Sequence, residues 1–326
     1  MTAPKGMEKT EKESNMKGIV CMTTAMCACA LAAYPAPWGV DASTPEKRAA
    51  IIEKFWKHDA SADTVLWPEG KVPMQVSQKP FKFLEHELGQ SNVVITDINV
   101  PQFTFFPAKG EGAKAVVVIL PGGGYAQLGW NKEGTEIADW LNANGVSAAV
   151  LLYRAPHQRD AALCDVQRTI GLLRRDAKKY GIDPGKVGVI GFSAGANLAV
   201  RAATNWRTRR YERVDDADDF SCRPDFQLPI YPWDLLPKPG KGSAYTLKAD
   251  YPVDRETPPA FIAQAQDDFC QIETSLAYYQ ALRNADVKSE LHVYPSGGHG
   301  YGLRRLGTPC DAWSDAAALW LKNVLR

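Results

Sequence analysis

The strongest constraint on the fold is the stretch VGVIGFSAG at residues 187–195, where a short apolar run leads into Gly-x-Ser-x-Gly and then into a helical pattern. This strand–turn–helix context is typical of a nucleophile elbow, in which a sharp turn holds a Ser hydroxyl out from the carboxyl end of a sheet. Gly191 and Gly195 suit such a turn because a Cβ at either position would clash with closely packed backbone. The stretch predicts Ser193 as a nucleophile, against the simpler interpretation of a tight turn with a helix-capping Ser.

A carboxylate and a His follow this Ser in chain order. The apolar run 260–265 ends just before Asp267 and Asp268, and His299 lies in a glycine-rich loop after the strand pattern 291–294. The order Ser, acid, His is that of α/β-hydrolases. A Ser hydroxyl needs a base to take its proton, and the acid fixes the imidazole tautomer and stabilises the imidazolium. We expect His299 to be that base, rather than a loop His bonded only to backbone.

A glycine run supplies a further element of the expected site. PGGGY, residues 121–125, directly follows the apolar run 115–120. We expect the backbone N–H groups of Gly123 and Gly124, together with that of Ala194 after the nucleophile, to bind a developing oxyanion. An ordinary loop or a phosphate cradle is the alternative, although the Gly-Lys-Ser/Thr of a phosphate-binding P-loop is absent.

Strand and helix patterns alternate from residue 93 onward, which is the rhythm of a doubly wound, mostly parallel α/β sheet with helices on both faces. The expected strands are 93–100, 102–106, 115–120, 146–153, 187–191, 226–231, 260–265 and 289–294. The expected helices are 132–144, 161–180, 194–205, 273–284 and 311–325. Two stretches interrupt the alternation, the charged segment 206–225 and the segment 232–259, which is rich in Pro, Gly and Lys. Both lie at or beyond strand ends, where caps over active sites are inserted.

Composition gives evidence against two kinds of function, nucleic-acid binding and metal binding. The chain has 326 residues, of which 45% are hydrophobic, and a formal net charge of +1. This near-neutral charge gives no electrostatic reason to expect a nucleic acid as a partner. The cysteines do not show the spacing of a metal site, and a site of Ser, acid and His implies neither a metal nor a cofactor.

The first part of the chain has the pattern of a targeting segment. Lys17 precedes an apolar stretch at 18–33 that ends in small residues, as in a signal peptide. The acidic residues before it are untypical, and a start at Met16 would restore the pattern. We therefore expect a targeting segment at 1–33 and export to the periplasm or the outside, with a disordered or membrane-associated leader as the alternative. We expect no stable membrane insertion once the segment is removed.

Two further parts follow that segment. We expect an N-terminal extension at 34–90, with a helical pattern at 45–57, and a catalytic domain at 91–326. Four cysteines would remain in the processed chain, and an even number permits two disulfides in an exported protein, although free buried thiols are an equal reading. A bridge between Cys270 and Cys310 is one hypothesis, because each lies in the loop just after a catalytic candidate, Asp267 or His299, and such loops meet at one end of the sheet in this fold.

Residues 64–326 resemble the α/β-hydrolase superfamily, specifically the acetyl esterase/lipase group that includes acetyl xylan esterase-like proteins. The resemblance rests on LWPEG at 66–70, PGGGY at 121–125, Tyr153 with Arg154, Asp165 with Arg168, GIDP at 181–184, GFSAG at 191–195, SGGHGYG at 296–302 and AWSDAAALW at 312–320. The chain departs from the pattern at Ala196 and Asn197, where Gly and His are frequent, and after the acid, where Pro and Val are common. The first departure puts substrate preference in doubt more than catalysis.

The resemblance implies a serine carboxylesterase that forms an acyl-enzyme on Ser193 and hydrolyses short, acetyl-type esters on carbohydrates. It favours Asp267 as the acid, because residues 267–276 then align without gaps. It also implies that Arg154, Asp165 and Arg168 are structural. The polar residues of 206–225 suit a polar ligand: Arg207, Arg209, Arg210, Tyr211, Asp215 and Asp216.

Two other functions stay open. One is a prolyl-oligopeptidase-like peptidase, which usually carries a propeller domain; the roughly 90 residues before the core are few for four blades of about 40 residues each. The other is a non-catalytic binding module on the same fold, since fold alone does not determine function.

Overall fold

The computed structural model describes residues 40–41, 62–75, 82–88, 90–237 and 245–326. Residues Asp41–Arg326 form one compact unit. The expected targeting segment 1–33 and the helical pattern 45–57 lie outside the described residues, so both stay predictions. Across the described ranges, no helix combines the length and the apolar character needed to cross a membrane.

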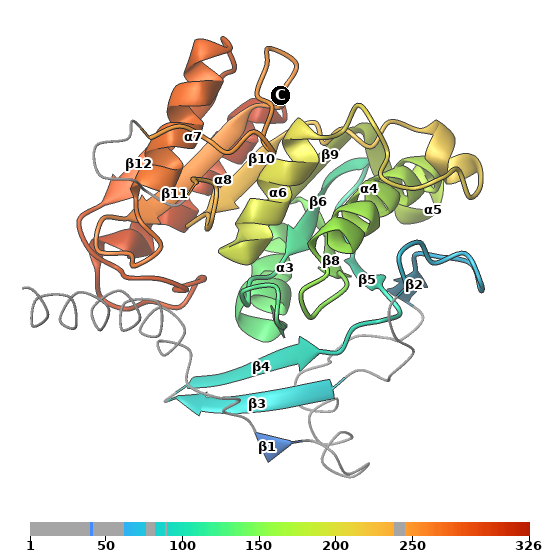
Figure 1. Ribbon diagram of the computed structural model, residues 1–326, viewed down its shortest axis with the longest axis horizontal. Helices are drawn as coiled ribbons and strands as arrows, with labels where there is room; N and C mark the ends of the chain where they lie inside the picture. The colour runs from blue at the N-terminus through green and yellow to red at the C-terminus, as the bar shows by residue number, and fades with distance from the viewer. Residues whose placement is uncertain (1–39, 42–61, 76–81, 89, 238–244) are drawn as a thin grey trace, which may run out of the picture. The chain divides into compact units, whose positions relative to one another are not determined.

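An eight-stranded sheet forms the framework, in the order β12-β11-β10-β9-β6-β8-β5-β2 (Figure 1). Its strands are β2 (Asp63–Val65), β5 (Gln102–Phe106), β6 (Lys114–Leu120), β8 (Ser147–Leu152), β9 (Ile182–Phe192), β10 (Gln227–Ile230), β11 (Ala260–Ala265) and β12 (Ser289–Tyr294). The six strands from β12 to β8 are parallel, and β5 and β2 extend the sheet antiparallel at one edge. The predicted doubly wound, mostly parallel sheet is confirmed.

The central strands are buried along nearly their whole length, as expected of strands covered on both faces. Pairing aligns their carboxyl ends, with Leu120 of β6 opposite Gly191 of β9, and Phe192 of β9 opposite Ile230 of β10. Loops that follow these strands therefore meet at one edge of the sheet, which is where an α/β sheet places its site.

Helices lie on both sides of this sheet; in Figure 1 α4 and α6 are in front of it and α8 is behind. They are α3 (Glu136–Ala143), α4 (Arg159–Arg175), α5 (Ala177–Tyr180), α6 (Ala194–Thr204), α7 (Glu273–Asn284) and α8 (Trp313–Val324), with the short turns η2 (Asn131–Thr135), η3 (Asp216–Asp219) and η4 (Pro309–Ala312). The rings of Trp140 in α3 and Trp313 in α8 lie 5.7 Å apart, and Arg201 of α6 pairs with Asp160 of α4.

The bounds of several elements differ from the sequence-based expectations. The strand expected at 93–100 is β4 (Gln90–Thr96), which belongs to a separate antiparallel sheet, and the strand expected at 187–191 begins at Ile182. Three helices differ as well. The helix expected at 132–144 begins as the π-helical turn η2, and the helix expected at 161–180 is divided at Asp176 into α4 and α5. The final helix is preceded by the 3-10 turn η4. In each of these helices the backbone hydrogen-bond pattern changes locally, and the spacing of apolar residues does not reveal such a change.

A smaller antiparallel sheet stands beside the site loops. It contains β3 (Lys82–Leu88), β4 (Gln90–Thr96) and β7 (Leu128–Gly129), and the two-residue strand β1 (Val40–Asp41) is the first described element. Val94 of β4 is opposite Gly129, and the N–H of Val93 donates to Asn131 Oδ1 at 2.8 Å. The sheet thereby holds the chain that follows the PGGGY run.

A buried ion pair ties α4 to the end of β8. Arg154 Nη2 lies 2.8 Å from Asp165 Oδ1, and these two side chains are 1% and 0% exposed. The indole N–H of Trp67 donates to the same carboxylate oxygen at 2.9 Å. This agrees with the structural role expected for Arg154 and Asp165.

Candidate functional site

Ser193 stands at the turn between β9 and α6 in the strained geometry that the motif predicts. Its φ is 54° and its ψ is −115°, a conformation rarely adopted by a residue with a side chain. A Cβ on Gly191 would lie 2.1 Å from the carbonyl oxygen of Gly195, and a Cβ on Gly195 would lie 1.9 Å from that of Leu120. The glycines are therefore required by the close packing of β9, α6 and β6, which is what keeps the turn sharp.

His299 reaches this Ser from the loop that follows β12. Its Nε2 lies 2.8 Å from Ser193 Oγ, and its side chain is 7% exposed. The ring of Tyr231 packs against the imidazole, with centroids 5.0 Å apart. The structure thus brings together the two residues that the sequence placed 106 positions apart as nucleophile and base.

The acid that contacts His299 is Asp268. Both of its carboxylate oxygens lie 2.9 Å from His299 Nδ1. Gln264 Nε2 donates to Oδ2 at 3.0 Å, and the N–H of Cys270 donates to Oδ1 at 2.7 Å. A carboxylate only accepts hydrogen bonds, so Nδ1 carries the proton and Nε2 faces Ser193 as an acceptor.

The assignment of Asp267 as the acid is therefore wrong in its geometry. Asp267 is exposed, and its Oδ1 accepts hydrogen bonds from the N–H groups of Gly297 and Gly298, at 3.0 and 2.8 Å. The chain turns at residues 266–267, directly after β11, so that the carboxylate of Asp268 contacts the imidazole and that of Asp267 contacts the glycine loop. Asp267 therefore shapes the loop that carries His299.

The PGGGY run lies against the elbow as expected of an oxyanion loop. A Cβ on Gly122 would lie 2.5 Å from the Phe192 carbonyl oxygen and 3.0 Å from Ser193 Cβ. Gly123 and Gly124 have φ values of 139° and 64°, which glycine adopts without strain. Within the described part of the chain, the N–H groups of Gly123, Gly124 and Ala194 donate to no protein acceptor. These three donors are therefore available to a ligand.

Glu133 contacts the buried side of this loop, and the sequence did not predict a role for it. This side chain from η2 is buried, and its Oε2 accepts from the N–H of Gly122 at 2.8 Å. Its Oε1 accepts from the hydroxyl of Tyr231 at 2.8 Å, and that hydroxyl in turn accepts from the N–H of Gly302 at 3.1 Å. Burial and the nearby Glu133 carboxylate raise the pKa of Tyr231 well above its usual value, so its hydroxyl stays a donor. One buried carboxylate thus connects the PGGGY loop, the end of β10 and the His299 loop.

The four described cysteines are free and buried, so the hypothesis of a Cys270–Cys310 bridge is wrong for this structure. Cys270 Sγ lies 3.7 Å from His299 Nε2, while Cys310 Sγ contacts the hydroxyl of Thr308 at 3.1 Å. Burial and the adjacent Asp268 carboxylate raise the pKa of the Cys270 thiol well above its usual range, so the thiol is neutral. Cys270, Asp268 and His299 offer the ligand atoms of a possible metal cluster, all within 4.8 Å of one another. The carboxylate and the imidazole already bind each other there, so we assign no metal to the cluster.

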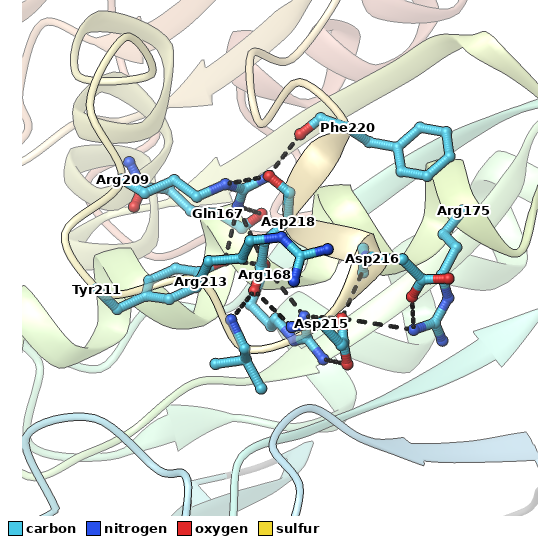
Figure 2. A network of polar contacts seen from close by, with 12 residues as sticks. Gln167, Arg168, Arg175, Arg209, Tyr211, Arg213, Asp215, Asp216, Asp218 and Phe220 are labelled. Atoms are coloured by element: carbon cyan, nitrogen blue, oxygen red, sulfur yellow. Dashed lines mark hydrogen bonds and ion pairs between the residues drawn. The ribbon is translucent and has the colours of Figure 1, made fainter.

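The charged segment 206–225 is used for internal contacts. Arg168 of α4 donates to Asp215 at 2.7 Å and to Asp218 at 3.1 Å, and Arg209 contacts the hydroxyl of Tyr211 (Figure 2). Asp215 also caps η3 by accepting from the N–H of Ala217. These contacts attach the segment 206–225 to α4. The structure therefore gives no support to the prediction that its polar residues bind a polar ligand.

Two family models match this chain. The BD-FAE model matches residues 104–227, and the model of the prolyl oligopeptidase family matches residues 166–325. The first range contains the PGGGY run and Ser193; the second contains Ser193, Asp268 and His299.

Individual proteins are similar over longer ranges. The acetylxylan esterase of Xylanibacter ruminicola is 30% identical over 251 residues, which are 71% of this chain and 50% of the relative. The chain therefore spans about half the length of that protein. The crystal structure of an acetyl ester-xyloside bifunctional hydrolase from Caldicellulosiruptor lactoaceticus has 29% identity and a TM-score of 0.67, covering 80% of this chain and 96% of that one. MGS-M1, an α/β hydrolase from a Medee basin deep-sea metagenome library, has 24% identity and a TM-score of 0.54, covering 76% and 99%, and shows the shared fold.

The sheet, the elbow after β9 and the order of Ser193, Asp268 and His299 define an α/β-hydrolase, and this chain belongs to that superfamily. Within the superfamily it is similar to the acetyl esterase group, to which its acetylxylan esterase relative points.

Proposed function

We propose that this protein is a serine carboxylesterase that hydrolyses short-chain esters, acetyl esters above all, on carbohydrates. The observation that carries the proposal is the hydrogen-bonded series Ser193 Oγ, His299 Nε2, His299 Nδ1 and Asp268, with separations of 2.8 and 2.9 Å. These are the distances that general-base activation of a Ser hydroxyl requires.

The first half of the reaction forms an acyl-enzyme. Ser193 Oγ attacks the ester carbonyl carbon while its proton passes to His299 Nε2, and Asp268 stabilises the imidazolium that results. The carbonyl oxygen becomes an oxyanion, which the N–H groups of Gly123, Gly124 and Ala194 bind. The carbon–oxygen bond to the alcohol then breaks, and His299 returns the proton to the departing alcohol oxygen.

The second half uses the same residues in reverse. A water takes the place of the alcohol, loses its proton to His299 Nε2 and attacks the acyl carbon. The bond to Ser193 Oγ breaks as that oxygen recovers the proton, and the carboxylic acid leaves. Side chains of the protein perform every proton transfer in this sequence.

The choice of an acetyl group on a carbohydrate rests on the similar proteins, one named an acetylxylan esterase and another an acetyl ester-xyloside hydrolase. Export of the mature protein is part of the proposal, because an acetylated polysaccharide is too large to enter a cell. The apolar stretch after Lys17 supports export.

The test is hydrolysis of p-nitrophenyl esters with acyl chains from two to eight carbons, together with acetate release from acetylated xylan. We expect the highest kcat/KM at the shortest chains, release of acetate, and loss of both activities in Ser193→Ala. A fluorophosphonate probe should label the parent protein and leave Ser193→Ala unlabelled. Highest kcat/KM at eight carbons, without acetate release, would reject the carbohydrate acetyl ester as substrate.

A peptidase is the second candidate, because the prolyl oligopeptidase family model matches residues 166–325. Proline-containing aminoacyl-p-nitroanilides are the discriminating substrates. Turnover of these anilides with a higher kcat/KM than the acetyl esters would favour the peptidase. Absence of turnover on every substrate would favour a non-catalytic binding module.

A further inference from the structure

Phe269 is an exposed aromatic residue in direct contact with the catalytic His. Its side chain is 64% exposed, and its ring lies 4.7 Å from the imidazole of His299, centroid to centroid, with an angle of 52° between the planes. It follows Asp268, so the turn that buries the acid also presents this ring to solvent. Burial of a large apolar side chain is favourable, so a ligand that covers this ring beside His299 would gain binding free energy.

The reaction determines which part of the substrate this ring meets. In the proposed mechanism the alcohol oxygen takes its proton from His299, so the alcohol half of the ester must lie beside the imidazole. The acyl carbonyl must face Gly123 and Gly124, on the other loop. A ring packed on the imidazole therefore adjoins the alcohol half.

The residues around the ring indicate what kind of alcohol fits. The other exposed positions on the turn are Gln266, Asp267 and Gln271, which offer amide and carboxylate groups to solvent. A pyranose ring combines an apolar face of C–H groups with a rim of hydroxyls, so it matches one aromatic face surrounded by polar side chains. A long alkyl alcohol would call for a continuous apolar groove, and the exposed side chains of this turn alternate with buried ones instead.

We propose that Phe269 is a stacking platform for the sugar ring of the alcohol half, and so makes the enzyme select acetylated sugars over acetates of simple alcohols. The proposal rests on the esterase reaction proposed above. The interaction adds to the binding of the sugar in the ground state and in the transition state alike, so its loss should raise KM more than it lowers kcat.

The test compares two esters that share the acetyl group and differ in the alcohol, xylose tetraacetate and ethyl acetate. For Phe269→Ala we expect KM for xylose tetraacetate to rise about tenfold, within the range of a lost aromatic contact, and kcat/KM for ethyl acetate to stay within about twofold. Phe269→Trp should retain the parental preference, and Phe269→Leu should lose most of it. Phe220→Ala, at another exposed Phe in the segment 206–225, is the matched control and should change neither value.

A second measurement is independent of the fraction of enzyme that is folded. With p-nitrophenyl acetate as donor, the acyl-enzyme divides between water and an added alcohol, and the ratio of acetylated alcohol to acetate is a property of each active molecule. Phe269→Ala should lower this ratio for added xylose and leave it unchanged for added ethanol.

Each outcome has one meaning. Equal losses on both esters, mainly in kcat, would show that Phe269 shields or supports His299 and would overturn the stacking proposal. Unchanged KM and unchanged partition for xylose in Phe269→Ala would overturn it as well. If the parent protein hydrolyses neither ester, the proposed function fails, which is a result distinct from either of these.

Discussion

Asp268 and His299 face each other through two equal contacts, with both carboxylate oxygens 2.9 Å from Nδ1. Asp267, one residue earlier, binds backbone instead, through the N–H groups of Gly297 and Gly298. The two adjacent carboxylates thus contact different parts of the same loop. Asp268 binds the His299 ring, and Asp267 binds the main chain just before it.

Asn substitutions separate these two actions. Asp268→Asn should lower kcat by about 10³–10⁴-fold, because the amide cannot stabilise an imidazolium and favours the wrong tautomer. Asp267→Asn should lower kcat/KM by less than about tenfold, since its amide oxygen can still accept the two backbone N–H bonds. Steady-state kinetics on p-nitrophenyl acetate gives both values.

Asp267→Ala extends the same comparison. It removes the acceptor from Gly297 and Gly298 and should cost more than Asp267→Asn, while remaining milder than Asp268→Asn. A large loss in Asp267→Asn with a mild effect in Asp268→Asn would contradict the geometry described here.

This pair also shows where reasoning from the sequence ends. Ser193 and His299 were predictable because each lies in a local motif whose glycines have a backbone reason to be there. The choice between Asp267 and Asp268 depends on how the turn after β11 meets a loop 30 residues further on, and both residues have the same chemistry. The local sequence does not show how a turn aligns with a distant segment. Alignment to a family pattern therefore favoured Asp267, whereas the structure places Asp268 at His299.

Elsewhere too, features with a local sequence pattern were predictable, and features that depend on tertiary contacts were not. The bounds of β5, β11, α7 and β12 were predicted to the residue, since each has a clear apolar period and ends at turn residues. Glu133 and the ion pairs of 206–225 were not predicted in their roles, because a charged residue that is buried by tertiary contacts looks in sequence like one on the surface. Their partners come from other elements and become visible only in three dimensions.

Glu133 should support the reaction through the oxyanion loop. Glu133→Ala removes the acceptor for the Gly122 N–H and the Tyr231 hydroxyl, so we expect kcat to fall about 10²-fold, comparable to the loss of an oxyanion donor. Glu133→Gln keeps one acceptor and should lower kcat by about tenfold with KM nearly unchanged. Glu136→Gln is the matched control, because Glu136 lies three residues away on the next helix and pairs with Arg304 near the surface.

Melting temperatures are measured alongside these rates. Two unsatisfied polar groups in Glu133→Ala should also cost about 1–3 kcal/mol each in the free energy of unfolding. Parental kcat in Glu133→Ala, with the protein folded, would remove Glu133 from the account of catalysis.

The four described cysteines should resist modification in the folded protein. All are buried, and burial raises the pKa of Cys164 to about 12 and raises the pKa values of Cys222, Cys270 and Cys310 as well. A neutral, buried thiol is a poor nucleophile. Alkylation at pH 8 followed by peptide mapping should find these four unmodified in native protein and modified in guanidinium chloride. A peptide pair linked through Cys270 and Cys310 would contradict the free thiols of this structure.

The network of Figure 2 should make stability depend on pH in acid. The hydrogen bond from Arg168 is the main reason that the pKa of Asp215 is about 2, below the usual 3.8. A carboxyl group whose pKa is lower in the folded state stabilises the protein above its unfolded pKa and loses that contribution as the pH falls through the folded value. Stability from Asp215 is therefore complete above about pH 4 and is lost between pH 4 and pH 2. Asp215→Asn should flatten the pH dependence of the unfolding free energy in this window and lower that free energy by about 1 kcal/mol at pH 7.

The Asn can still cap η3, so the change isolates the charge. Asp218 also contacts Arg168 and has a lowered pKa, so part of the slope should persist. Asp216→Asn, on the same turn but with a side chain 70% exposed, is the control and should keep the parental slope. Urea unfolding at pH 2.5, 3, 4 and 7 measures all three proteins; parallel curves for the parent and Asp215→Asn would show that the Arg168 contact adds no pH-dependent stability.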